Sequence, residues 1–203
     1  MKNAATGIYL IVAALLISAG WSGEAVNSPQ TDDVIQTPAG TSLAAGLSIK
    51  DMVDRSDLIA LGSCVETKSV WAGRTLVTLA TISLAETLKG GEAGTITVAL
   101  PGGIDANRKV PIAMSYPGAP RITPGEDVFL FLTTDSEAAG NYTVTGFSQG
   151  KFSIVKDEEG KQIVTRDLTK TSLKDNNGVR RGSAEVTPLS SLKAQVKAHL
   201  RQR

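Results

Sequence analysis

Apolar residues occur in short runs from residue 58 onward, and their spacing predicts strands. The two longest runs, 58–71 and 75–88, are rich in β-branched residues, and the second has too much Thr and Ser for a stable helix. A helix over the second half of 75–88 is the alternative. Shorter runs of the same kind lie at 95–100, 127–133, 141–147, 152–156 and 161–166. The chain is therefore predicted to be mainly β.

Two features of these runs indicate how the strands are arranged. Gly62 lies where a strand can bulge or bend sharply. Residues 127–133, DVFLFLT, form the most apolar run and are expected at the centre of the sheet. The β domain is predicted to span residues 47–168.

The first 25 residues have the layout of a Sec-type signal peptide. Lys2 provides a basic start, and the uncharged run 7–19 is shorter than the roughly 20 apolar residues that span a bilayer. Small residues offer cleavage sites after Gly20 or Ala25. We therefore predict a periplasmic or extracellular protein with no stable membrane insertion after cleavage. An uncleaved N-terminal anchor is the alternative.

The segment between the signal peptide and the first strand has two parts. Residues 26–46 are poor in large apolar side chains and are predicted to be a flexible leader. Ser48 is then expected to cap a short helix over 49–55, with Met52 and Val53 turned inward.

The C-terminal part is predicted to be a linker followed by a helix. Residues 169–186 are polar and are expected to be a mobile linker. Thr187 is expected to cap a helix over 187–203, with Pro188 at its first position. The apolar stripe of this amphipathic helix is Leu189, Leu192, Val196 and Leu200.

Residues 102–123, which contain three prolines, form the longest interruption between strands. Segments of this length often carry function, and this one combines cations with an aromatic residue. The turn 148–151 supplies further polar side chains. The candidate partner-binding residues are Arg108, Met114, Tyr116, Arg121, Gln149 and Lys151. The alternative is that the segment only covers an opening of the domain.

Five phrases resemble an uncharacterised class of exported bacterial domains, some of which occur beside a metalloprotease domain. In order over 56–155, the phrases are SDLIALGSCV, ETLKGG, ALPGG, YPGAPRITPGEDVFLFL and GFSQGKFSIV. More distantly, the opening strand, the strand ending in Lys-Gly and the Gly-rich loop resemble the netrin-like domain. These resemblances imply a small antiparallel OB-like barrel with a short N-terminal helix and a C-terminal amphipathic helix.

The single cysteine limits what the netrin-like resemblance implies. Netrin-like metalloprotease inhibitors chelate the active-site zinc through an N-terminal cysteine, and this chain has none there. Cys64 lies in an apolar run, where a buried small side chain is expected. A single cysteine cannot form an internal disulfide, and its position argues against a lipoprotein anchor.

Charge and residue chemistry narrow the function classes. Lys and Arg (21) and Asp and Glu (20) are interspersed, which argues against nucleic acid as a partner. The single histidine, His199, lies in the predicted final helix, and no zinc or calcium pattern is present in the sequence, so we expect no metal or other cofactor. The default catalytic carboxylates are Glu86, Glu126 and Asp127. For Glu126 and Asp127, turn hydrogen bonds or a position at a solvated edge explain the carboxylates better than catalysis does.

We therefore expect an exported, non-enzymatic binding or interaction module whose partner is a protein, with a small ligand as the alternative. The resemblance and analogy of fold suggest a partner or regulator of an extracytoplasmic protease. The alternatives are a carboxylate-based hydrolase and a purely structural envelope protein.

Overall fold

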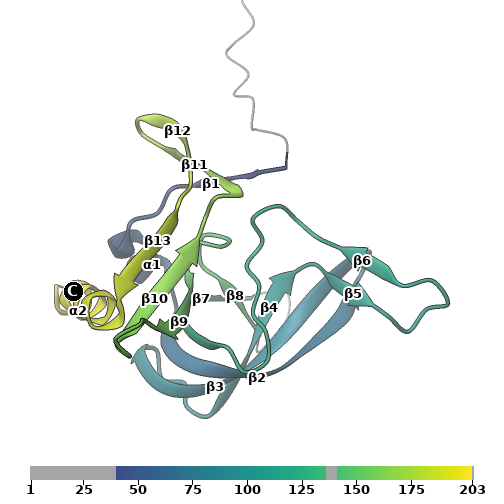
Figure 1. The fold of residues 1–203 in the computed structure, drawn as a ribbon, viewed down its shortest axis with the longest axis horizontal. Helices are drawn as coiled ribbons and strands as arrows, with labels where there is room; N and C mark the ends of the chain where they lie inside the picture. Colours follow the sequence, from purple (N-terminus) through teal and green to yellow (C-terminus); the bar gives the residue numbers. More distant parts are fainter. Residues whose placement is uncertain (1–39, 136–140, 203) are drawn as a thin grey trace, which may run out of the picture. The chain divides into compact units, whose positions relative to one another are not determined.

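The computed structural model describes residues 40–135 and 141–202, and it is mainly β with two helices, as predicted (Figure 1). The predicted signal peptide, 1–25, and the predicted leader as far as residue 39 lie outside these residues. In the part that the structure describes, no helix has the length and apolar character needed to cross a membrane.

The helices and strands follow one another with short connections. In chain order they are β1 (Ser42–Ala45), α1 (Ile49–Arg55), β2 (Leu58–Ala72), β3 (Thr75–Lys89), β4 (Thr95–Pro101), β5 (Gly103–Asp105), β6 (Ile112–Met114), β7 (Asp127–Thr134), β8 (Asn141–Val144), β9 (Lys151–Lys156), β10 (Gln162–Asp167), β11 (Thr171–Asp175), β12 (Gly178–Arg181), β13 (Ala184–Pro188) and α2 (Leu189–Arg201).

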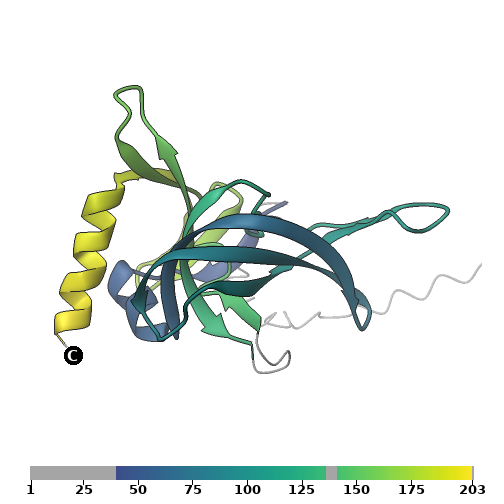
Figure 2. The same cartoon turned by 90° about the horizontal axis from the view of Figure 1, so that it is seen from below.

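Eight of the strands form one sheet in the order β13-β10-β9-β7-β2-β3-β4-β8. Strand β8 pairs in parallel with β4 and antiparallel with β7, so the last strand of this order is also hydrogen-bonded to a central one. Strands β1, β11 and β12 form a second sheet, and the β5–β6 hairpin forms a third. In two views the β5–β6 hairpin projects beyond the main sheet (Figures 1 and 2).

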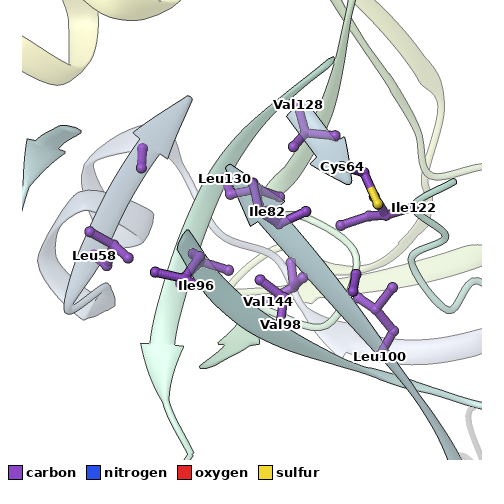
Figure 3. Packing of buried hydrophobic residues seen from close by; sticks show 13 residues of the cluster. Leu58, Cys64, Ile82, Ile96, Val98, Leu100, Ile122, Val128, Leu130 and Val144 are labelled. Carbon is purple, nitrogen blue, oxygen red and sulfur yellow. The ribbon is translucent and has the colours of Figure 1, made fainter. Parts of the chain in front are cut away.

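The central strands β2 and β7 are buried on both faces because alternate side chains enter two different cores. The first core lies among β2, β3, β4, β7 and β8 (Figure 3). Its residues are Leu58, Ala60, Cys64, Ala80, Ile82, Ile96, Val98, Leu100, Ile122, Val128, Leu130, Leu132 and Val144. The continuous apolar run of β7 is explained by this double burial, and its predicted central position is confirmed.

The second core lies between the other face of these strands and the two helices. Its residues are Met52, Val53, Ile59, Leu61, Phe129, Phe131, Phe152, Val164, Leu189, Leu192 and Val196. Three phenylalanine rings form its centre, with centroids 5.4–6.4 Å apart. Each helix therefore covers the sheet with its apolar side.

Several local predictions are confirmed. Residues 75–88 lie within a strand that pairs along its length with β2, so the helical alternative is wrong. The register shifts between Leu61 and Gly62, as expected of a bulge. The helix at 49–55 has the predicted cap, since the Asp51 amide donates to Ser48 Oγ at 3.1 Å.

The predicted flexible leader (26–46) and polar linker (169–186) require correction. Strand β1 pairs in parallel with β11, and Ser42 N donates to Lys170 O at 3.1 Å. The supposed linker holds β11, β12 and much of β13, and β13 pairs with β10 in the main sheet. Backbone hydrogen bonds between distant segments hold these polar strands, so apolar spacing did not reveal them.

The boundaries of two predicted elements also differ. Thr187 and Pro188 belong to β13, and α2 begins at Leu189 without a side-chain cap, because pairing with β10 keeps both residues extended. Strand 141–147 ends at Val144, because Gly146 and Phe147 both have positive φ and turn the chain.

We predict that Gly62→Ala lowers the free energy of unfolding by about 2 kcal/mol. An added Cβ would meet the Ser83 carbonyl oxygen and lie 2.9 Å from Ile82 Cγ2. Urea denaturation measures this change. Gly91→Ala is the control, because no atom lies within 4 Å of its added Cβ. Equal stability of the two variants would contradict the close approach at Gly62.

Candidate functional site

The second half of the predicted excursion runs between two cavities. We call residues 115–121 the wall segment. The larger cavity has a volume of about 690 Å³ and the smaller one of about 490 Å³. The residues that line both are Ser115, Tyr116, Ala119, Pro120 and Arg121. The structure thus places two predicted candidates, Tyr116 and Arg121, on both cavities.

The wall segment is held at its middle and directly after its last residue. After it, Ile122 is buried in the first core beside the Cys64 sulfur (Figure 3). Near its middle, Gly118 has φ +69° and packs so closely that an added Cβ would meet Thr171 Oγ1 and lie 2.7 Å from Lys170 O. These two anchors give the wall segment a defined position.

A partly buried ion pair holds the connection from the wall segment to β7. Glu126 accepts hydrogen bonds from Lys151 Nζ at 2.5 Å, Ser153 Oγ at 2.7 Å and Thr123 N at 3.0 Å. The side chains of Lys151 and Glu126 are only 14% and 19% exposed. Burial of the Glu126 carboxyl opposes its ionisation, but the hydrogen bonds from Lys151 and Ser153 outweigh this and lower its pKa. The predicted candidate Lys151 therefore lines the larger cavity as half of an ion pair.

One face of the main sheet forms the opposite side of the larger cavity. The sheet residues that line it are Lys151, Ser153, Thr165, Arg166, Asp167, Ala184, Glu185 and Val186. Apart from Arg166 and Glu185, they alternate along β9, β10 and β13, and Thr165 lies directly opposite Val186 in the register. Val186 is 66% exposed, so the cavity has an apolar side chain on its sheet face.

Charged groups of both signs surround the larger cavity. Arg121 and Lys170 are exposed, and neither has an ion-pair partner among the residues that the structure describes. Asp167 accepts from the hydroxyl and amide of Thr169, which lowers its pKa and keeps it ionised. Arg166 and Glu185 also line the cavity and form an ion pair with each other. The cavity therefore offers two cations without an ion-pair partner in the described part of the chain, together with two carboxylates, Asp167 and Glu185.

The smaller cavity lies beside the β5–β6 hairpin. Met114 lines it and accepts a hydrogen bond at Sδ from Leu76 N at 3.3 Å. Ile104, Ile122 and Leu100 add apolar surface. Met114, predicted as a contact residue, thus forms part of a mainly apolar lining.

Two predicted candidates lie elsewhere. Gln149 is 1% exposed, and its amide donates to Ala45 O and Gly146 O while its oxygen accepts from Leu47 N. The side chain of Gln149 is thus used inside the protein, where it secures the segment before α1. Arg108 lies on the β5–β6 hairpin outside both cavity linings.

The three default carboxylates have separate partners. Glu86 accepts from Lys193 and lies 3.6 Å from Lys197 Nζ, and the Lys193 hydrogen bond lowers its pKa. Asp127 accepts from Ser63 Oγ, and Glu126 is bound as described above. Between residues 40 and 202, leaving out 136–140, no three His, Cys, Asp or Glu side chains are placed to hold a metal ion.

Cys64 and His199 lie apart from the cavities. Cys64 is buried, as predicted, and burial raises the pKa of its thiol. His199 lies in α2, and its buried Nδ1 has no hydrogen-bond partner in the described part of the chain.

Sequence reasoning missed the residues contributed by 169–186. Lys170, Ala184 and Val186 line the larger cavity, but that stretch was expected to be a linker. The alternation of apolar and polar residue types over 184–188, AEVTP, was the available signal. Comparisons with known protein families, curated proteins and solved structures find no match to this chain. The site is therefore argued from its own geometry.

We predict that Gly118→Ala destabilises the fold by about 3 kcal/mol, and Gly125→Ala by about 1 kcal/mol. Both glycines have positive φ, but only the Cβ at Gly118 meets neighbouring atoms. Urea denaturation measures the difference, and limited proteolysis at the wall segment reports its local release. If the two variants are equally stable and equally resistant, the wall segment is not anchored at Gly118.

We predict that Glu126→Gln lowers the free energy of unfolding by about 2 kcal/mol at pH 7, because it leaves Lys151 without its counter-ion. The pKa of Glu126 is lower in the folded than in the unfolded chain, so its stabilisation is present above the unfolded value and is lost as pH falls through the folded one. The difference from the unmodified chain should therefore shrink below about pH 4.

Urea denaturation from pH 3 to pH 8 tests this pH dependence. Glu159→Gln is the control. Both side chains of the Glu159–Lys161 ion pair are exposed, so this pair contributes little to the free energy of unfolding. A difference for Glu126→Gln that stays constant with pH would rule out the ionised carboxylate as the cause.

Proposed function

We propose that this chain is an exported, non-enzymatic interaction module that binds a protein partner across the wall segment. The observation that carries the proposal is the pair of cavities separated by this segment. Tyr116 and Arg121 line both cavities, and Tyr116 is 43% exposed. Tyrosine and arginine are frequent binding hot spots in protein interfaces.

The arrangement of the cavities favours a protein over a small ligand. Each volume lies within the range of ligand pockets, and one ligand of ordinary size fills only one of them. A protein surface can insert one side chain on each side of the wall segment while contacting Tyr116 and Arg121 between them. A mainly apolar side chain suits the smaller cavity, and an acidic one suits Arg121 and Lys170.

The state of the carboxylates supports a non-enzymatic role. Glu86 and Glu126 are bound to lysines, and the hydrogen bonds from those lysines lower their pKa values. Neither is a proton donor at neutral pH, whereas a glycosidase acid needs a raised pKa. We keep the carboxylate-based hydrolase and the purely structural envelope protein as the alternatives.

Three finer statements belong to the same proposal. Export rests on the signal-peptide pattern of residues 1–25. Action on an extracytoplasmic protease rests on the resemblance of phrases in 56–155 to exported bacterial domains. A small OB-like barrel is supported by the pairing of β7 with both β2 and β8, since these pairings connect β7-β2-β3-β4-β8 into a ring.

We predict that the chain from Val26 captures a protein from envelope or extracellular extracts and that Tyr116→Ala with Arg121→Ala reduces this capture at least tenfold. Every described contact lies at or beyond residue 40, so the chain from Val26 retains them all. Mass spectrometry of the captured material, followed by titration with the purified partner, measures the effect.

The matched control replaces an exposed apolar residue and an exposed cation outside both cavities, Val155→Ala with Lys156→Ala. It should capture as much as the unmodified chain. Equal capture by both double variants, or no capture by any form, would argue against the wall segment as a protein-binding site. Either result would favour the carboxylate-based hydrolase or the structural envelope protein.

A further inference from the structure

The end of the β2–β3 hairpin is bonded to β5 of the β5–β6 hairpin, whose turn projects beyond it (Figure 2). Trp71 Nε1 donates to Asp105 Oδ2 at 2.8 Å, and Ile104 N donates to Ser69 Oγ at 3.0 Å. The Arg108 guanidinium lies 5.1 Å from the Trp71 ring centroid.

This pair of hairpin ends exposes apolar side chains from both segments. Trp71 is 37% exposed, Ile104 62% and Val110 73%. An exposed large apolar residue is ordinary when it stands alone, but a group of them beside bonded hairpins indicates a contact surface. We define the tip cluster as Trp71, Arg74, Ile104, Arg108, Lys109 and Val110.

The tip cluster is also positively charged, although the chain as a whole is nearly neutral. Residues 67–76 contain two basic residues and no acid, and residues 102–111 contain two basic residues and one acid. That acid, Asp105, is bonded to Trp71 and Arg108. Arg74 and Lys109 are exposed and have no ion-pair partner among the residues described here. The cluster therefore has surplus cations beside exposed apolar groups.

We propose that the tip cluster docks on an anionic lipid surface. Trp71 would lie at the level of the headgroups, Ile104 and Val110 at the start of the acyl region, and Arg74 and Lys109 beside lipid phosphates. Neither of the two cavities described above is lined by Trp71, Lys109 or Val110. Cations combined with exposed apolar groups match an anionic lipid surface.

This contact is peripheral and goes beyond the proposed protein binding. Only the ends of the two hairpins enter the contact, since the rest of β2 and β3 is paired within the main sheet. The wall segment takes no part in the contact, so the two proposals can fail separately.

The test mixes the chain from Val26 with vesicles of phosphatidylcholine and phosphatidylglycerol in a two-to-one ratio, and with vesicles of phosphatidylcholine alone. The sequence has two tryptophans, Trp21 and Trp71, so in this chain Trp71 is the only one. We expect co-sedimentation with the anionic vesicles, a blue shift of Trp71 fluorescence, and weakening of both by salt.

Variants of the tip cluster separate its two contributions. Arg74→Gln with Lys109→Gln should lower the partition coefficient about 20-fold, because two cations near the surface are removed. Ile104→Ser with Val110→Ser should lower it at least about tenfold. The matched control, Val155→Ser with Lys156→Gln, should bind as the unmodified chain does. Circular dichroism checks that each variant folds. The blue shift of Trp71 fluorescence is measured on the unmodified chain, so this part of the test does not depend on whether a variant folds.

The contrary outcomes are specific. No blue shift, or equal binding to both kinds of vesicle, would overturn the proposal. It would also be overturned if both tip-cluster variants bound the anionic vesicles as the unmodified chain does, or if Arg74→Gln with Lys109→Gln, which lie outside both cavities, lost capture of a protein that the unmodified chain binds without lipid. Tyr116→Ala with Arg121→Ala should bind vesicles normally, which separates this test from that of the wall segment.

Discussion

The burial of β7 on both faces constrains the rest of the structure. Its odd and even side chains enter different cores, and its backbone pairs with β2, β8 and β9. A shift of one residue would exchange Phe129 and Phe131 for the smaller aliphatic side chains of the opposite face. Neither core has room for that exchange, so the register of every neighbouring strand is fixed by packing.

This constraint extends to the candidate site because the wall segment leads into β7. Ile122 is already in the first core, and Glu126 immediately precedes the strand and is bonded to Lys151 of the neighbouring β9. The connection between them has little freedom to move. A binding surface held in this way loses little conformational entropy when a partner docks, which favours affinity.

The sequence predicted the features that depend on local spacing. The apolar run of β7, the bulge at Gly62 and the Ser48 cap each arise from residues close together in the chain. The parallel pairing of β1 with β11 has no such local pattern, because backbone hydrogen bonds join segments about 130 residues apart. The same reason explains the site. Tyr116 and Arg121 were identifiable as an aromatic residue and a cation in a long loop. Their neighbours come from other segments, Lys170 from the turn between β10 and β11 and Val186 from β13, which pairs with β10.

The wall segment and the tip cluster belong to one excursion, residues 102–123, and the base of its hairpin is closed. An added Cβ at Gly102 would lie 2.7 Å from Met114 O, and the Gly102 amide donates to Leu76 O at 3.0 Å. The hairpin is therefore joined closely to β3. Because Ile104 belongs to the tip cluster and also lines the smaller cavity, the two surfaces meet at this side chain. Docking of the tip cluster on lipid would then fix the direction in which the wall segment faces its partner, and it would confine the search for that partner to the membrane surface.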